Sequence, residues 1–410
     1  MASSEGEEGR RPFASVGEAA RAGEAATGGD AVPLVPSVEL STSAAYASMA
    51  ALDAALGGGG GFHYARHGHP TAAALERAVA ALEGTDEAVA AASGMAALHL
   101  VLDALAPPGE GHTIVASTDL YGATSALLER RRADGTRVVR VPLAPTPNAL
   151  EVVARERPRL VLVETIANPL LRVADLEVLA QAVHAAGGRL VVDNTFASPA
   201  LVRPAALGAD AVVESATKYL GGHGDVVAGV VALGAAAAAP VRRLARLYGA
   251  VLEPWACYLV LRGLRTLGLR VRRQSESALW LAERLREVAG VREVVYPGLA
   301  SHPDHAVARR LFGDRGFGGV LTLRLDGGRE TAWATLEHLE RVRTGPTLGD
   351  LVSLALHPAT ASHRALSAAE REAAGVTEDL VRLSVGIEEP EEILADVARA
   401  VAAAQARSAR

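Results

Sequence analysis

Cysteine and long apolar runs are almost absent from this 410-residue sequence. Its single cysteine, Cys257, excludes an internal disulfide and a zinc site built from cysteines. A lone thiol also suits a reducing compartment, so we expect a cytoplasmic protein. No stretch reaches the roughly eighteen unbroken apolar residues of a membrane helix. The polar start MASSEGEEGRRP lacks the apolar core of an export signal. We therefore expect no membrane partner.

An excess of positive charge is also missing. The 41 lysines and arginines are outnumbered by 47 aspartates and glutamates, and the formal net charge is -6. Recognition of nucleic-acid phosphates needs a basic surface, so we expect no nucleic-acid partner. Hydrophobic residues make up 50% of the chain, which is enough to build a large core. The composition predicts a soluble globular protein.

Lysine occurs once. Lys218 is the only lysine among the 41 basic residues, which leaves 41 − 1 = 40 arginines. An arginine replaces a lysine as a surface charge, but its guanidinium neither loses its proton near neutral pH nor forms an imine. The survival of this lysine favours amine chemistry at position 218, although a residue left by chance would give the same count.

Composition and periodicity divide the chain into three parts. Residues 1–60, rich in alanine, glycine, glutamate and serine, predict an N-terminal arm that is partly disordered. Between 61 and 260, short apolar segments alternate with helical patterns, which predicts an α/β domain with a mostly parallel sheet covered on both faces. The first helix of this domain is expected to have Thr71 as its N-cap. Residues 261–410 predict a smaller α+β domain.

Three groups of polar residues follow predicted strands, where open α/β sheets bind their ligands. Residues 93–95 begin a predicted helix whose free N–H groups suit a phosphate. Asp193 ends the apolar segment RLVVDNT, and residues 215–218 bring two hydroxyl groups close to the lysine. Taken alone, each group has an ordinary explanation as a strand-to-helix turn, a capping or metal-binding aspartate, or a polar turn.

Together, these groups match the needs of pyridoxal 5′-phosphate (PLP). PLP requires an amine for its aldehyde, a phosphate cradle of helix N–H groups and hydroxyls, and an acid that faces the ring nitrogen. A carboxylate favours the protonated ring, which withdraws electrons from a carbanion. Tyr121, in DLYG, is the candidate for stacking on the ring, while an ordinary half-buried tyrosine remains the alternative.

Longer motifs extend this pattern from Tyr64 to Ala400. In chain order they are YARHGHPT, LEGTDEAVAAASGMAAL, DLYGAT, VDNTFASP, GADAVVESATKYLGGHGDV, RGLRTLGLR, YPGL and LVRLSVGIE. The motifs resemble those of the Cys/Met-metabolism PLP-dependent enzymes, which include cystathionine γ-synthases, cystathionine and methionine γ-lyases and O-acylhomoserine sulfhydrylases. The resemblance implies the α/β architecture of PLP-dependent transferase fold type I, which is aspartate-aminotransferase-like, with a large mostly parallel sheet and a smaller α+β C-terminal domain.

The resemblance also implies roles for the matching residues. Lys218 would bind PLP covalently and shuttle protons, Tyr121 would stack on the ring and assist proton transfer, and Asp193 would pair with the ring nitrogen. The residues implied to hold the phosphate are Gly94, Met95, Ser215 and Thr217, joined by Tyr64 and Arg66 of a neighbouring subunit. The residues implied to surround the substrate are Arg382, which would clamp its α-carboxylate, Thr347 and Asn168, with Glu164 near the ring's phenolic oxygen. A shared site implies a homo-oligomer, and relatives are usually tetramers built as dimers of dimers.

The substrate loop departs from the family pattern. Relatives commonly have serine where Thr347 stands, and a glutamate before that serine would attract a second ammonium group, which Pro346 cannot do. Ala65 and His69 also replace a serine and an asparagine. We therefore expect γ-elimination from a γ-substituted L-amino acid, which includes substrates with a non-sulfur leaving group. The alternative is γ-replacement of the cystathionine γ-synthase or O-acylhomoserine sulfhydrylase type.

Three neighbouring histidines, His63, His67 and His69, could suggest a metal site. A metal site needs converging ligands and supporting hydrogen bonds. Because this segment already matches the motif expected at the subunit boundary, we expect no bound metal.

Overall fold

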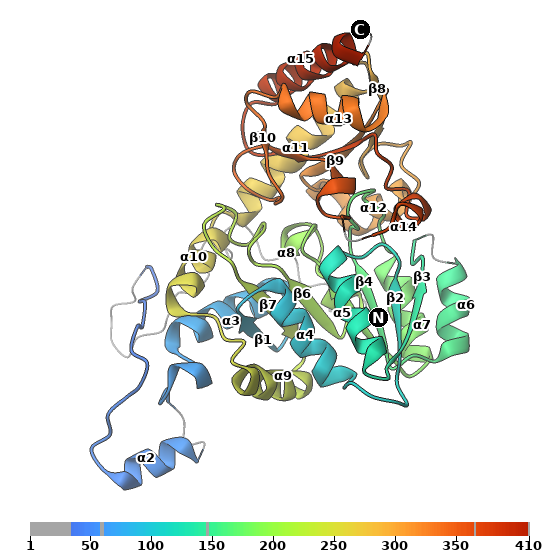
Figure 1. Cartoon of the computed structure of the whole chain (residues 1–410). Coiled ribbons are helices and arrows are strands. Elements are labelled where there is room, and N and C mark those ends of the chain that lie inside the picture. The colour runs from blue at the N-terminus through green and yellow to red at the C-terminus, as the bar shows by residue number, and fades with distance from the viewer. Residues whose placement is uncertain (1–33, 58–60, 145–146, 365, 409–410) are drawn as a thin grey trace, which may run out of the picture.

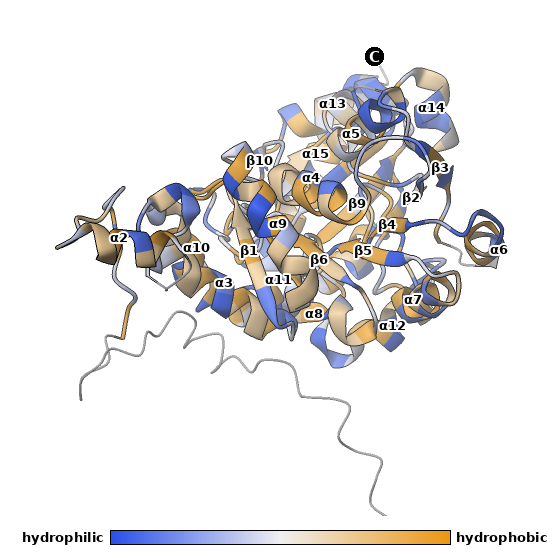
Figure 2. Cartoon of the chain, turned by 90° about the horizontal axis from the view of Figure 1, so that it is seen from below, coloured by the Kyte–Doolittle hydropathy of each residue, from blue (hydrophilic) through white to orange (hydrophobic). Residues whose placement is uncertain are grey.

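The computed structural model describes residues 34–57, 61–144, 147–364 and 366–408. Most of the arm predicted at 1–60 therefore lies outside the described residues. The described part of the arm carries helix α2 (Met49–Leu56) and extends away from the body of the molecule (Figures 1 and 2). No residue of α2 is buried, so this helix leaves its apolar side chains uncovered in the single chain.

A seven-stranded sheet forms the centre of the larger part of the molecule (Figure 1). Strand β7 is antiparallel to its neighbours β1 and β6, and the other strands run parallel to one another. Across the sheet the strands are β1 (Glu87–Ala91), β7 (Gly229–Leu233), β6 (Ala211–Glu214), β5 (Arg189–Asp193), β4 (Leu160–Glu164), β2 (Thr113–Ser117) and β3 (Arg137–Val141).

Helices cover both faces of this sheet. Val191 and Val192 are adjacent in β5 and point to opposite faces, yet both are fully buried, in separate apolar clusters. One face packs against α4 (Gly94–Leu105), α5 (Gly122–Ala133) and α9 (Ala235–Tyr248). The other face packs against α3 (Pro70–Glu83), α6 (Pro147–Glu156) and α7 (Leu176–Ala185), with the short helix α8 (Ser198–Leu201) beyond the end of β5. The predicted mostly parallel sheet with helices on both faces is confirmed.

The start of helix α3 differs from the prediction. Thr71 is not the N-cap; His69 is, and its Nδ1 accepts a hydrogen bond from Ala72 N at 3.1 Å. Pro70 occupies the first helical position, where its missing N–H costs nothing and its fixed φ favours the helix. The Thr71 hydroxyl instead accepts a hydrogen bond from Glu39 N at 3.0 Å and ties the arm to the helix.

Two helices, α10 (Pro254–Leu264) and α11 (Leu267–Leu285), lead to a five-stranded, mainly antiparallel sheet (Figure 1). Its strands, in order across the sheet, are β10 (Arg343–Thr344), β11 (Leu354–Leu356), β12 (Leu380–Ser384), β9 (Val320–Leu325) and β8 (Val291–Val295). The helices of this part are α12 (His305–Phe312), α13 (Gly328–Glu337), α14 (Ala368–Ala373) and α15 (Pro390–Ser408).

Short 3-10 helices fill several connections: η1 (Ala65–His67), η2 (Pro204–Leu207), η3 (Gly313–Arg315) and η4 (Pro358–Thr360). Polar contacts join the two parts of the molecule. Thr322 Oγ1 donates to Pro169 O at 2.7 Å, and Arg172 Nε donates to Asp304 Oδ2 at 2.6 Å. In the ranges that the structure describes, no helix combines the length and the apolar character needed to cross a bilayer.

Candidate active site

Most of the predicted site residues lie at one edge of the large sheet. Strands β1, β4, β5 and β6 run parallel, so their C-terminal ends meet there, as open α/β sheets require for ligand binding. The predicted residues that follow or end these four strands are, in strand order, Gly94, Asn168, Asp193 and Lys218. The chain order of the strands thus brings together residues that are far apart in sequence.

The N-terminus of α4 packs closely against the turn after β6. Ser93 is the N-cap of α4, and its Oγ accepts a hydrogen bond from Ala96 N at 3.1 Å. The first N–H groups of a helix have no partners within it. A Cβ atom on Gly94 would lie 2.8 Å from Ser215 Cβ, so glycine permits an approach that a larger residue would block. Fixed N–H groups beside a hydroxyl make a cradle suited to phosphate.

Met95 and Thr217 support this cradle. Met95 Sδ accepts a hydrogen bond from Thr124 Oγ1 at 3.9 Å. Thr217 Oγ1 donates to Ala228 O at 3.2 Å and accepts from Ala228 N at 3.0 Å. The Thr217 side chain therefore fixes the turn that carries Ser215 and the lysine.

The Lys218 amine meets the loop between β10 and β11. Its Nζ donates to Thr347 Oγ1 at 2.7 Å, which joins the two parts of the molecule at this point. Burial lowers the pKa of Lys218 to about 8, with a further contribution from the charge of Arg382. A lysine with this pKa has a substantial fraction of neutral, nucleophilic amine near neutral pH.

Arg382 lies buried on β12 with one donor unused. Its Nη1 donates to Asn168 Oδ1 at 3.0 Å and its Nη2 to Thr347 O at 3.0 Å. Arg382 Nε is buried and has no hydrogen-bond partner among the described residues. Burial lowers the pKa of Arg382 to about 10, so the guanidinium stays charged at neutral pH. A buried cation with an open donor suits a carboxylate ligand.

Asp193 and Glu164 are paired in register at the ends of β5 and β4. Asp193 Oδ1 accepts a hydrogen bond from Thr195 N at 3.0 Å, and burial raises the pKa of this aspartate. Burial and the charge of Asp193 raise the pKa of Glu164 well above its usual range. Glu164 Oε1 also accepts a hydrogen bond from Tyr121 N at 2.5 Å. A cation placed against Asp193 would favour its ionised form again.

These residues fit PLP in three respects. Lys218 supplies an amine that is partly neutral near pH 7, and the turn before α4 supplies backbone donors for a phosphate. Asp193 is a partly buried acid that forms no ion pair among the described residues, and a protonated ring nitrogen would supply a cationic partner. The arrangement is therefore that of a PLP site.

Comparison with known proteins decides the family. A sequence profile of the Cys/Met metabolism PLP-dependent enzymes matches residues 19–402. This chain belongs to that family. It is 39% identical over 368 residues to the O-succinylhomoserine sulfhydrylase of Pseudomonas aeruginosa, which covers 89% of this chain and 90% of that protein. It is 40% identical over 344 residues to an L-methionine gamma-lyase of Fusobacterium nucleatum subsp. polymorphum, which covers 82% of this chain and 85% of that protein.

A solved structure of the Cys/Met metabolism family shows the same fold. The cystathionine gamma synthase of Xanthomonas oryzae pv. oryzae, in complex with aminoacrylate and cysteine, superposes with a TM-score of 0.89 at 37% identity, covering 97% of this chain and 100% of that chain. The predicted family, fold type and PLP dependence are confirmed, and the protein is an enzyme of this class. The relatives include a γ-lyase, a γ-synthase and a sulfhydrylase, so elimination and replacement both occur among them.

Tyr121 lies near Arg382, and its backbone N donates to Glu164 at the end of β4. Its side chain is about half exposed. Tyr64 and Arg66 have other neighbours in the single chain. Arg66 Nη1 donates to Arg246 O on α9 at 2.7 Å, and its guanidinium carbon lies 5.6 Å from the centre of the Tyr64 ring. The polar and ring interactions of both residues are with this outer region of the chain.

The loop after β11 contributes two residues that the sequence did not indicate. Ser362 O lies 3.0 Å from where a Cβ atom on Gly122 would stand, next to Tyr121. Ser362 Oγ and His363 Nδ1 lie 2.9 Å apart. Burial, followed by the charge of Arg382, lowers the pKa of His363 to about 4, so its ring is neutral at pH 7. No local pattern marks this irregular segment, because tertiary contacts alone bring it to the site.

The three histidines near Tyr64 do not converge. His63 Nε2 and His67 Nδ1 lie 2.9 Å apart, which is a hydrogen bond between the two rings. His69 is separate, because its Nδ1 caps α3 and its Nε2 contacts Leu252 O at 3.0 Å. Within the described ranges, no group of three or more histidine, cysteine, aspartate and glutamate side chains is arranged to hold a metal ion.

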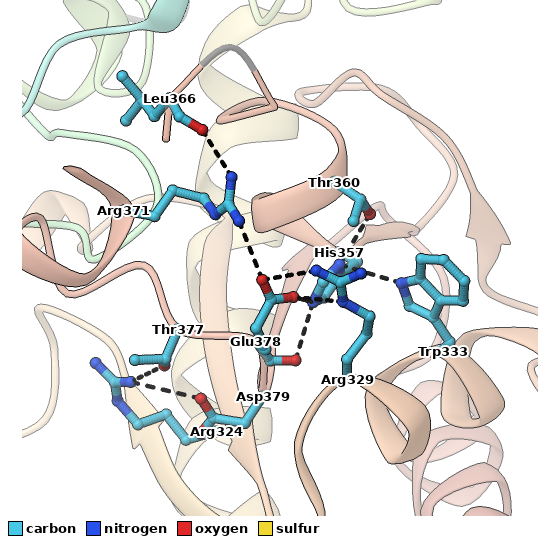
Figure 3. Close-up of polar contacts among 10 residues, drawn as sticks. All are labelled: Arg324, Arg329, Trp333, His357, Thr360, Leu366, Arg371, Thr377, Glu378 and Asp379. Carbon is cyan, nitrogen blue, oxygen red and sulfur yellow. Dashed lines mark hydrogen bonds and ion pairs between the residues drawn. The ribbon is translucent and has the colours of Figure 1, made fainter. Parts of the chain in front are cut away.

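A polar network on the smaller sheet holds both ends of segment 358–377, which includes the Ser362 loop (Figure 3). Glu378 accepts hydrogen bonds from Arg329 at 2.7 and 2.8 Å. Trp333 Nε1 donates to His357 Nδ1 at 3.2 Å, so His357 carries its proton on Nε2 and donates to Glu378 O at 3.0 Å. The network therefore anchors the segment that brings Ser362 to the site.

We expect Glu378→Gln to lower the melting temperature by up to about 3 °C at neutral pH, because exposed ion pairs stabilise weakly. Hydrogen bonds from Arg329 hold the pKa of Glu378 below its usual value of 4.5. The contribution of this carboxylate to the stability of the folded protein is thus full above pH 4.5 and is lost as the pH falls through its folded pKa. Thermal unfolding followed by circular dichroism should show the two proteins converge in acid. Glu330→Gln, an exposed change next to Arg329 on α13, is the control. Equal melting temperatures of the Glu378 variant and wild type at pH 7 would contradict the assignment.

Proposed function

We propose that this enzyme catalyses γ-elimination from a γ-substituted L-amino acid. The overall reaction consumes water and releases the protonated leaving group, a 2-oxo acid and ammonia. The observation that carries the proposal is the meeting of the Lys218 amine and the Arg382 guanidinium at Thr347. Thr347 thereby fixes two groups on either side of it: an amine that can accept a proton, and a guanidinium that can bind an α-carboxylate.

Each side chain of the site has a separate role in this reaction. PLP, when bound, supplies an electron sink for negative charge that develops on the substrate carbons. Arg382 binds the α-carboxylate, which directs the Cα–H bond toward Lys218. Lys218 Nζ removes the α-proton and moves it within the site. Tyr121 Oη, beside Arg382, or Lys218 Nζ then protonates the leaving group, while Asp193 holds the ring nitrogen in its protonated form.

Elimination is favoured over replacement by the composition of the substrate loop. Residues 345–349 read GPTLG and contain no ionisable side chain. A second amino acid that enters as a nucleophile carries an ammonium and a carboxylate, and these five residues offer a charged partner to neither group. Replacement remains the second candidate, because relatives named as a sulfhydrylase and a synthase share the fold and 37–39% of the sequence.

We also propose that the active form is a homotetramer built as a dimer of dimers, located in the cytoplasm. Tyr64 and Arg66 are exposed in the single chain, so their side chains are free to enter the site of a neighbouring subunit. Large apolar residues of the N-terminal segment, α9 and α10 are exposed as well; these are Leu40, Met49, Leu56, Phe62, Leu247 and Trp255. A partner subunit that covered them would remove this apolar area from water.

A panel of γ-substituted L-amino acids tests the proposed reaction. Substrates with thioether, thiol, acyloxy and halide groups at Cγ are supplied with and without an added thiol, and 2-oxo acid, ammonia and replacement product are measured. We expect 2-oxo acid and ammonia in equal amounts from at least one substrate, with little change when the thiol is added. A product that forms only with the thiol and without ammonia would support replacement instead.

The reaction of Lys218 with PLP should depend on pH. With a pKa of about 8, the neutral amine makes up about a tenth of Lys218 at pH 7 and about half at pH 8. We expect the rate of covalent PLP capture to rise about fivefold between these values and to level off above pH 9. Stopped-flow absorbance measures the rate, and a PLP analogue without the aldehyde is the control. A rate that still rises tenfold for each unit between pH 8 and 10 would mean that the amine has an ordinary pKa.

A further inference from the structure

Two glutamates are buried against each other behind the PLP site. Glu83 is the last residue of α3 and Glu214 the last residue of β6, and their side chains are 0% and 1% exposed. Each carboxyl group acts on the pKa of the other, so the two lie close together. Because buried carboxyl groups are rare unless paired, two of them in contact call for a physical explanation.

The pair lies on the opposite side of the sheet from Asp193. Asp193 and Val213 are in register on neighbouring parallel strands and share one face. Glu214 follows Val213, and Asn194 follows Asp193, so both point to the other face. There Asn194 Nδ2 donates to Glu83 Oε1 at 3.4 Å. The pair is thus joined to the residue next to Asp193.

The oxygens of the pair lack donors. Glu83 Oε2 and both carboxyl oxygens of Glu214 are buried and have no donor from any other described residue. Two carboxylates cannot donate to one another, since each only accepts. A single proton between them supplies the missing donor, satisfies both groups and removes one of two buried negative charges.

The surroundings of the two glutamates favour the protonated form of the pair. Burial raises the pKa of Glu83 to about 7. Burial, followed by the charges of Glu83 and Asp193, raises the pKa of Glu214 well above its usual range. The groups of other elements that act on the pair are the Asn194 amide, the Arg203 guanidinium, whose charge acts on Glu83, and Asp193, whose charge acts on Glu214 from the other face of the sheet. One cation beside three carboxyl groups does not balance their full ionisation.

We propose that Glu83 and Glu214 share one proton and act as a positioning pair, which holds the strand end that carries Asp193 and fixes the charge behind it. The inference rests on the proposed role of Asp193 toward the PLP ring. Loss of the shared proton adds a negative charge to the pair. That charge stabilises protonated groups at the site, so the proton on the nitrogen joining Lys218 to PLP leaves at a higher pH than it otherwise would.

The stability of the full-length protein freed of PLP tests the shared proton. A carboxyl group whose pKa is raised on folding contributes stability that is full below pH 4.5 and is lost as the pH rises through about 7. In Glu214→Gln the amide donates to Glu83 and does not titrate. We expect its melting temperature, relative to wild type, to rise by a few °C between about pH 5 and pH 8. Glu330→Gln, the exposed control, should show no such trend.

Two outcomes would overturn the shared proton. A difference in melting temperature that is the same at all pH values would mean that the pair is only packed there. Glu83→Gln replaces the other carboxyl group of the pair, and its melting temperature is compared with that of wild type over the same pH range. If neither variant folds, the proposal also fails, because an amide supplies the donor that the proton supplies.

The visible spectrum of the PLP-bound protein tests the link to the site. We expect the midpoint of its alkaline spectral change to fall by roughly half a pH unit in Glu214→Gln and in Glu83→Gln, because each pair then carries one negative charge less. An unchanged midpoint would overturn the link to Asp193. If wild type binds no PLP at Lys218, the proposed function fails, whereas the melting temperatures without PLP still test the pair.

Discussion

Replacement of Lys218 by arginine should reduce turnover about 100- to 10,000-fold or abolish it, while the protein still folds. The guanidinium keeps the positive charge and offers N–H donors to Thr347 Oγ1, so a hydrogen bond can still join the two parts of the molecule. What is lost is an amine that can bond to the PLP aldehyde and exchange protons near neutral pH. Steady-state assays with the best substrate of the panel, together with the absorption spectrum, measure the effect.

Thr347→Val is the matched control for this variant. It removes the hydroxyl that accepts from Lys218 Nζ and leaves the amine in place. We expect the control to retain the visible absorption of bound PLP and to lose less than about tenfold in turnover, as for one hydrogen bond. Normal turnover by Lys218→Arg would exclude the assigned role of the lysine.

Replacement of Arg382 by alanine should lower kcat/KM by roughly 30- to 150-fold, which corresponds to the loss of about 2–3 kcal/mol of charge-assisted hydrogen bonding. Most of the change should appear in KM, because the guanidinium binds the α-carboxylate in the ground state and in the transition state alike. Its buried Nε has no partner among the described residues, and its Nη atoms are fixed by Asn168 and Thr347, so the fork is oriented before substrate arrives.

Two controls separate carboxylate binding from general damage at Arg382. Arg324→Ala, on the neighbouring strand β9, removes an arginine that bonds to Thr377 and Glu293, and we expect its KM to be unchanged. A substrate analogue that lacks the α-carboxylate should react equally slowly with wild type and Arg382→Ala. An unchanged KM for the normal substrate in Arg382→Ala would mean that the carboxylate binds elsewhere.

Local patterns predicted the strands and the turns that follow them. The segment RLVVDNT is apolar up to Asp193 because β5 is buried on both faces, so the strand and its functional end were visible together. Ser93 before an apolar helical stretch predicted the start of α4 in the same way. The start of α3 was wrong at Thr71, since proline at the first helical position and a histidine cap outweigh a threonine one residue later.

Long-range convergence could not be predicted from local patterns. The contact of Lys218 with Thr347 joins residues from different sheets, and family resemblance alone pointed to it. His363 and the pair of Glu83 and Glu214 had no such signal. Glu83, before a glycine at a helix end, has the sequence context of an exposed residue. Its burial depends on where Glu214 and Asn194 lie in the folded sheet.

Borohydride reduction followed by peptide mapping tests the assignment of Lys218 most directly. Reduction makes the bond between an amine and PLP permanent, so mass spectrometry can locate the added cofactor. Because the chain has one lysine, the only competing primary amine is its terminal α-amino group. We expect the added mass on the peptide that contains Lys218, at close to one cofactor per chain. An unmodified Lys218 peptide after reduction of the PLP-saturated enzyme would contradict the central claim.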